Sequence, residues 1–305
     1  MEEKSYARRI RMPDGTLVNR YSAIDPAKYA TECTCGKPHC LRARLLPFRE
    51  HVAKLHNVIG LLLDERVFGS LSSGWSGALH GLRLAASIED IEADTGYVDN
   101  PMVFALCEPT IDYENANSEM ASKYVAGATI FGFCWHAYES AVGATATTEI
   151  AKLLKEERFG ERGRRLLEAR SGLSVHFPGL REILRLSMHQ CEHGGLFSER
   201  LNRLKVRFPT EGLVLAAELS REFRNFLFHG EDRPPDHEEW GSAIVSHCRL
   251  CRFYSVSRLL LYLLQALAWI EVGEGSDLMN LEFEGREVRP RQVLESLQFV
   301  TEDIG

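Results

Sequence analysis

Apolar residues recur every three or four positions along most of the chain, and this spacing predicts amphipathic helices. Val52, Leu55, Ile59 and Leu62 form one such stripe. The expected helices cover residues 48–66, 78–95, 119–142, 147–157, 211–229 and 238–272, with a short last helix from Arg291. Two or three short helices are expected within 158–210, with breaks at Gly172, Pro178 and Gly194-Gly195. The fold class predicted is therefore mainly α.

Four stretches lack this periodicity. Residues 1–45 are rich in turn-forming residues, with Pro13-Asp14-Gly15 as one turn, and residues 69–77 are rich in glycine and serine, which predicts a loop. Residues 101–112 are weakly strand-like or a loop. Residues 281–288 alternate apolar and polar side chains around Gly285, which predicts a small C-terminal hairpin.

Length and charge indicate an ordinary globular chain. A chain of 305 residues can bury one large core or two smaller ones. The first residues carry no apolar signal segment. The longest apolar run, 259–270, is interrupted by Gln265 and is too short to span a bilayer, so it predicts a buried core helix. We expect a cytoplasmic protein that makes no membrane contact.

The most informative motif is Arg224-Asn225-Phe226-Leu227-Phe228-His229, followed by Gly230. It ends the predicted helix 211–229, whose apolar stripe is formed by Leu215, Leu219, Phe223 and Phe226. At about 100° per residue, Arg224 and His229 fall on opposite flanks of the polar side, with Arg221 and Asn225 between them. Gly230 and the following Pro234-Pro235 are typical of a helix end. The plainer interpretation of His229 is a C-terminal helix residue favoured by the helix dipole.

The spacing R-N-x-x-x-H followed by glycine resembles the signature of the HEPN superfamily, in its large prokaryotic branch related to the Apea-like group. The resemblance implies a helical bundle, typically dimeric, that acts as a metal-independent endoribonuclease in toxin–antitoxin or antiviral defence. It also implies that Arg224 and His229 are catalytic and that Asn225 supports them. The segment from Phe131 to Glu139 is similar to the first long helix of the family, in which an acidic residue faces the Arg–His pair. Glu139 is the matching position, although an ordinary solvated carboxylate would also account for it.

The resemblance divides the chain into three parts. Residues 119–273 would form the HEPN-like helical domain, with an insertion at about 158–210. Residues 1–118 would form an N-terminal region that carries a candidate zinc knuckle, and residues 274–305 a tail with the hairpin and a helix.

Basic residues gather in two places, although the net charge is −7 and nucleic-acid-binding proteins usually present a basic face. The first cluster contains Arg158, Arg162, Arg164, Arg165 and Arg170, and the second contains Arg200, Arg203, Lys205 and Arg207. Either cluster could bind RNA phosphates. In the first, the interleaved glutamates Glu156, Glu157, Glu161 and Glu168 favour a solvated helical face instead.

Three thiols and an imidazole lie within eight residues at Cys33, Cys35, His39 and Cys40. Soft ligands at this density suit a structural, tetrahedral Zn²⁺. The fourth ligand is open, because His39 directly precedes Cys40; His247, Cys248 and Cys251 are the alternatives. Reduced thiols in a loop are the interpretation without a metal.

Two other groups are weaker metal candidates. Cys248 and Cys251 lie one helical turn apart and read as small core residues on the last helix. His189, Cys191 and His193 have no second cluster at metal-ligand spacing and read as a loop.

The mechanism implied by the motif is transesterification of RNA. The 2′-hydroxyl attacks phosphorus, His229 takes or returns a proton, and Arg224 neutralises charge in the transition state. The products are a 2′,3′-cyclic phosphate and a 5′-hydroxyl, and DNA is not cleaved because it lacks the nucleophile. One chain offers one imidazole for a reaction that needs an acid and a base, so we predict a homodimer with two motifs face to face.

Partners follow from this hypothesis. They are RNA, a second copy of the chain, and a cognate antitoxin or defence-system protein. The apolar residues Tyr254, Leu260, Leu264 and Trp269 of the last helix would pack inside the bundle and across the dimer interface. The alternative function is a catalytically silent, zinc-stabilised HEPN-like subunit that binds or dimerises within a nucleic-acid or signalling complex.

Overall fold

The computed structural model describes residues 9–11, 17–19, 25–31, 33, 35–37, 39–68, 72–95, 108–145, 159–194, 197–235, 243–273 and 275–300. The α-helices are α1 (Pro26–Thr31), α2 (Phe48–Asp64), α3 (Ser72–Ser87), α5 (Glu108–Ala144), α7 (Phe159–Glu168), α8 (Leu180–His193), α9 (Ser198–Arg207), α10 (Leu213–Phe228), α11 (Ala243–Glu271) and α12 (Pro290–Ser296). Short 3₁₀ helices are η1 (Leu41–Arg44), η3 (Ser171–His176) and η5 (Ser276–Leu278). The predicted mainly α class is confirmed.

Two small antiparallel strand pairs complete the described part of the fold. β1 (Arg9–Arg11) pairs with β2 (Leu17–Asn19), and β3 (Leu281–Phe283) pairs with β4 (Arg286–Val288). The second hairpin was expected from sequence. Its two turn residues, Glu284 and Gly285, both have positive φ, as a tight two-residue turn requires, and a glycine adopts that conformation without strain.

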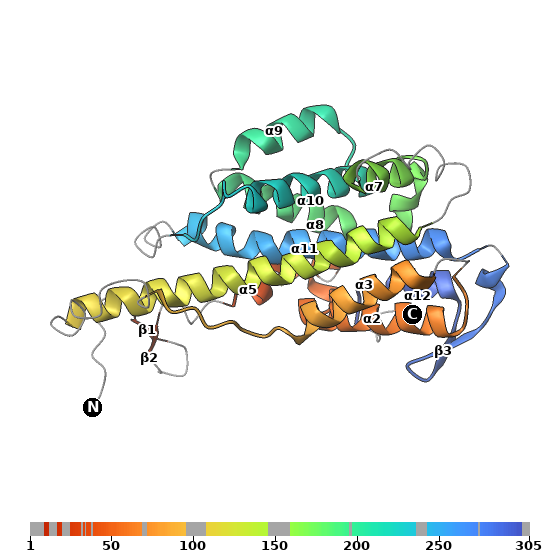
Figure 1. Cartoon of the computed structure of the whole chain (residues 1–305), viewed down its shortest axis with the longest axis horizontal. Helices are drawn as coiled ribbons and strands as arrows, with labels where there is room; N and C mark the ends of the chain where they lie inside the picture. Colours follow the sequence, from red (N-terminus) through yellow and green to blue (C-terminus); the bar gives the residue numbers. More distant parts are fainter. Residues whose placement is uncertain are drawn as a thin grey trace.

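The helices pack around α11, which runs through the middle of the bundle (Figure 1). α5 lies along it, α2, α3 and α12 cover one side, and α7, α8, α9 and α10 form the other (Figure 1). One large buried cluster extends from Ala30 in α1 to Leu297 after α12, and a small second cluster contains Ala116, Met120 and Leu250. The division expected at 118/119 therefore falls inside α5, and residues on both sides of it share this core.

From Cys248 to Ala268, α11 is buried on all its faces. Its His247–Glu271 segment has the length and composition of a membrane span, but 89% of its most apolar window is buried inside the protein. The prediction of a core helix is confirmed. Leu260 and Leu264 are completely buried and Tyr254 is nearly so, while the guanidinium of Arg291 in α12 covers the ring of Trp269. The first three side chains therefore have no surface to offer a partner, which corrects the interface expected for them.

The expected loop at residues 69–77 is helical from Ser72 onward, because its glycines serve helix packing. α3 lies against α5 so closely that a Cβ at Gly74 would come within 2.5 Å of the Ala144 Cβ, and one at Gly77 within 2.8 Å of the Ser140 Oγ. At Gly81 a Cβ would lie 2.8 Å from the backbone oxygen of Phe133. Pattern rules interpret glycine as a helix breaker and carry no information about a distant partner helix.

Some other helix boundaries differ from those expected from the sequence. α5 begins at Glu108, so the described part of the stretch expected as strand or loop at 101–112 is helical. The breaks near Gly172, Pro178 and Gly194 are confirmed between α7, η3, α8 and α9. The helix expected at 147–157, the turn at Pro13-Asp14-Gly15 and residues 238–242 of the helix expected at 238–272 lie outside the described residues.

Gly81→Ala tests the close contact between α3 and α5. The new methyl group would meet backbone, which cannot rotate away, so we expect a loss of about 1–3 kcal/mol in the free energy of unfolding. Gly60→Ala in α2 is the matched control, since its Cβ would have nothing within 4 Å. There, alanine should raise helix stability by about 0.5–1 kcal/mol. Urea unfolding measures both, and equal effects at the two positions would contradict the packing.

Candidate active site at the end of helix α10

Helix α10 presents the Arg–Asn–His motif at its C-terminal end. The backbone N–H of Leu213 donates to the Ser174 Oγ at 3.2 Å, and the predicted stripe of Leu215, Leu219, Phe223 and Phe226 is buried as expected. The helix ends in a Schellman motif, in which the N–H of Glu231 bonds the carbonyl of Phe226 at 3.2 Å. Gly230, at φ +73°, supplies the left-handed residue that this ending favours. The stop signal expected at Gly230 is confirmed.

Asn225 contacts both of the other motif residues. Its side-chain Oδ1 accepts a hydrogen bond from Nη1 of Arg224 at 3.3 Å, and its backbone oxygen accepts one from the N–H of His229 at 3.0 Å. The Arg224 guanidinium lies 5.4 Å from the ring centroid of Phe228, and its buried Nε has no hydrogen-bond partner among the described residues. The His229 side chain is exposed. The helix end therefore holds the arginine and leaves the imidazole open to a ligand.

The loop after His229 is anchored by a buried ion pair. Arg252 of α11 bonds to Asp232, and both side chains are fully buried. The guanidinium lies 5.5 Å from the ring centroids of both Phe223 and Phe226 in α10. Burial and the charge of Asp232 raise the pKa of the nearby Tyr124. Because Asp232 follows His229 by three residues, this pair fixes the chain on the C-terminal side of the motif.

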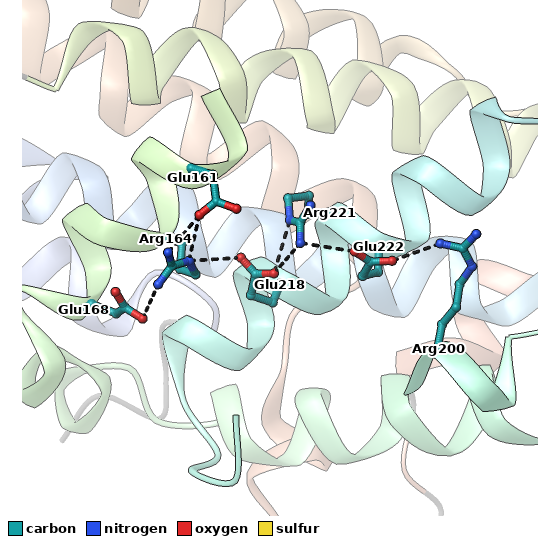
Figure 2. Close-up of polar contacts among 7 residues, drawn as sticks. All are labelled: Glu161, Arg164, Glu168, Arg200, Glu218, Arg221 and Glu222. Carbon is teal, nitrogen blue, oxygen red and sulfur yellow. Dashed lines mark hydrogen bonds and ion pairs between the residues drawn. The ribbon is translucent and has the colours of Figure 1, made fainter. Parts of the chain in front are cut away.

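A chain of ion pairs follows the polar side of α10 (Figure 2). At its centre is Glu218, which is buried to 1% exposure and bonds to Nη2 of Arg221 at 2.7 Å. Arg164 of α7 approaches the other Glu218 oxygen at 3.5 Å. Glu222 pairs with Arg221 at 3.1 Å and with Arg200 of α9 at 3.0 Å, so it links the two arginines. The remaining members are Glu161 and Glu168 beside Arg164, and Glu231 beside Arg200.

This network bears on whether the two basic clusters are available to bind RNA phosphates. Arg164 and Arg200 each contact two or more glutamates, and Arg164 holds the pKa of Glu161 below its usual range. Lys205 is likewise paired with Glu192. Their charges are compensated within the protein. For Arg164 of the first cluster, the partners include the interleaved Glu161 and Glu168. Arg158 lies outside the described residues.

Glu139 lies toward the other end of the motif helix. The ring centroids of Phe131 in α5 and Phe223 in α10 lie 5.0 Å apart. Later in α5, the pKa of Tyr138 is raised by burial and by the charges of Glu218 in α10 and of Glu139. Because the later residue of α5 is near the earlier residue of α10, the two helices run antiparallel. Glu218 precedes His229 by three helical turns, a rise of about 16 Å. Within one chain, Glu139 is therefore not brought beside His229, and its acidic role stays a prediction.

Three of the four predicted zinc ligands come together. The Sγ atoms of Cys33, Cys35 and Cys40 lie within 4.8 Å of one another, with Cys40 and Cys33 at 3.6 Å. Gly36, at φ +65°, makes the turn between them. The pKa of Cys35 is lowered, chiefly by a hydrogen bond from the backbone of Lys37 and then by the Cys33 and Cys40 side chains. These residues could hold a metal ion.

His39 is exposed and is not part of this group, which corrects the ligand set expected from sequence. The backbone at Cys40 is extended, and consecutive side chains in extended backbone point in opposite directions. The alternative ligands Cys248 and Cys251 are buried on α11, as the core interpretation predicted. The loop expected at His189–His193 is the last part of helix α8. The two histidine rings are tilted against each other on its exposed face, and they belong to no metal-binding group among the described residues.

Comparison with known proteins adds no relative: no family model, no curated protein and no solved structure matches the chain. The resemblance to the HEPN superfamily therefore stays a prediction from the sequence motif.

Sequence reasoning missed Glu218, Glu222, Asp232 and Arg252. The spacing of Glu218, Arg221 and Glu222 at three and four residues is a detectable signal for pairing on one helix face. The presence of Arg252 and Arg258 inside an apolar helix was another, because a buried guanidinium needs partners.

Proposed function

We propose that this protein is a metal-independent endoribonuclease of the HEPN type, acting in a prokaryotic defence or toxin–antitoxin system. The observation that carries the proposal is the contact of Asn225 with both Arg224 and His229 at an exposed, anchored helix end. An imidazole open to solvent and a guanidinium held by Asn225 at the same helix end are the groups that cleavage through the 2′-hydroxyl requires.

Each residue has one role in this proposal. The 2′-oxygen bonds to phosphorus and the bond to the 5′-oxygen breaks, leaving a 2′,3′-cyclic phosphate. One imidazole removes the 2′-hydroxyl proton and another donates a proton to the 5′-oxygen. Arg224 neutralises charge on the non-bridging oxygens, while Asn225 holds the guanidinium through its Oδ1. Glu139 would assist only if a second chain brings it near.

The experiment is cleavage of total RNA by the purified protein, with and without EDTA. We expect equal cleavage in both, and a brief EDTA exposure with zinc analysis before and after separates catalysis from loss of a structural metal. Cleavage that requires added Mg²⁺ or Mn²⁺ would contradict the proposal.

The need for two proton carriers supports a homodimer, with the two copies of His229 near the twofold axis. An Arg224→Ala chain mixed with a His229→Ala chain should then recover part of the activity that each lacks alone, because the heterodimer keeps one Arg224 and one His229 at the shared site. Each variant mixed with itself is the control. A monomer that cleaves RNA at full rate at nanomolar concentration would contradict this arrangement.

Zinc is the metal that we propose for Cys33, Cys35 and Cys40, because soft thiolates favour it over magnesium or calcium. It would tie α1 to η1 across a segment with little other regular structure. A cognate antitoxin or defence protein is the partner class that this activity calls for.

A second function has its own supporting observation. The arginines along the polar side of α10, Arg164, Arg200 and Arg221, are paired with glutamates, and the net charge is −7. A silent, zinc-stabilised binding or dimerisation subunit fits this charge balance. Failure to cleave any RNA while binding a partner would favour it.

A further inference from the structure

A cavity of about 330 Å³ lies beside the first turn of α10, at the opposite end of that helix from His229. Side chains from α7, η3, α8 and the end of α9 form its wall, together with the connection 208–212. The 16 residues of α10 correspond to a rise of about 24 Å. This cavity is therefore separate from the candidate active site.

Apolar side chains make up much of the wall. Leu167 and Leu213 belong to the buried core, and Phe208 and Val214 pack against it from the cavity side. Val175 of η3 also lines the cavity and is 76% exposed. An apolar hollow of this size, open to solvent, can bury the apolar part of a small organic molecule.

The wall also carries two arginines without a carboxylate partner. Among the described residues, neither Arg181 nor Arg207 forms a hydrogen bond or an ion pair. The guanidinium of Arg207 lies 5.1 Å from the ring centroid of Phe208, so its charge is at the cavity wall. The pKa of Glu161 is lowered chiefly by its hydrogen bonds with Arg164 and least by the charge of Arg207, so that carboxylate is already engaged elsewhere.

The one carboxylate among the lining residues does not offset these two charges. Both oxygens of Glu211 accept from Nε of Arg185, at 3.0 and 2.9 Å, and Arg185 is not part of the wall. The first turn of α10 adds the positive end of its helix dipole to the same wall. The local charge is therefore positive, although the net charge of the chain is −7.

We infer that this cavity binds a small molecule that joins an apolar body to a carboxylate, such as an aryl or alkyl carboxylic acid. The apolar body would cover Phe208, Val175 and Val214, which gains free energy from the apolar surface removed from water. The carboxylate would pair with Arg181 and Arg207, because a guanidinium matches the geometry of a carboxylate. A phosphate ion fits less well, since it has no apolar part to bury. The inference does not depend on the ribonuclease proposal, because the cavity wall includes no residue of the Arg–Asn–His motif.

Equilibrium dialysis of the full chain with 1-naphthylacetate tests this inference. We expect saturable binding of one molecule per chain. Binding to Arg181→Gln and to Arg207→Gln should each be about tenfold weaker, because each variant loses a charged hydrogen-bond donor. Arg203→Gln is the matched control, since Arg203 is an exposed arginine of α9 that does not line the cavity, and it should bind the probe as the wild type does.

Two further measurements separate the charge from the apolar body. The uncharged 1-naphthylacetamide should bind at least about tenfold more weakly than the acid. Val175→Glu should abolish binding of the acid by repulsion while keeping the circular dichroism spectrum, because Val175 is an exposed position. Equal binding of the acid and the amide would overturn the inference. So would displacement of the probe by an equal concentration of inorganic phosphate, or a wild-type chain that shows no saturable binding.

Discussion

Replacement of His229 by alanine is expected to slow RNA cleavage by about 10²–10⁴-fold, because the reaction loses the group that moves protons to and from the ribose and the leaving oxygen. The fold should be unaffected, since the side chain is exposed and the helix ending depends on backbone bonds and on Gly230. Gel analysis of RNA fragments measures the rate, and circular dichroism checks the fold.

His193→Ala is the matched control for this variant. His193 is also an exposed histidine at the C-terminal end of a helix, but it lies on α8 and its ring contacts only His189 among the aromatic side chains described. Its loss should leave cleavage unchanged. Full activity of the His229→Ala protein would remove the catalytic assignment.

Asp232→Ala is expected to cost about 3–5 kcal/mol in the free energy of unfolding, since it leaves the guanidinium of Arg252 fully buried without its carboxylate. Urea unfolding measures this loss. Glu211→Ala breaks an exposed pair with Arg185 and should cost no more than about 1 kcal/mol.

A double variant separates a buried charge from general damage to the core. Replacing both partners, as Arg252→Met with Asp232→Leu, removes the unpaired charge, so its stability should exceed that of Asp232→Ala alone. Equal stability of the two proteins would show that the ion pair is not what anchors the loop.

Local pattern was sufficient for the motif helix. The stripe from Leu215 to Phe226 predicted which face is buried, and Gly230 predicted where the helix ends, because both depend on residues within a few turns. The three thiols could likewise be grouped from spacing. The orientation of His39 could not, because it depends on the backbone conformation at Cys40.

Features that join distant segments were not predicted. The glycines of α3 pack against residues of α5 more than fifty positions later, so they were interpreted as a loop. Arg252 and Asp232 lie twenty residues apart, and Arg164 reaches Glu218 from another helix. The long-range pairing that fixes the loop after His229 is therefore visible only in the fold.

The most direct test of the ribonuclease proposal is cleavage of a defined RNA oligonucleotide, compared with the same oligonucleotide carrying a single 2′-deoxy residue at the cleaved position. With the nucleophile removed, we predict no cut at that position, and the all-RNA substrate should give 2′,3′-cyclic phosphate and 5′-hydroxyl ends by mass spectrometry. Cleavage at the deoxy position, or products with 5′-phosphate ends, would contradict the proposed chemistry.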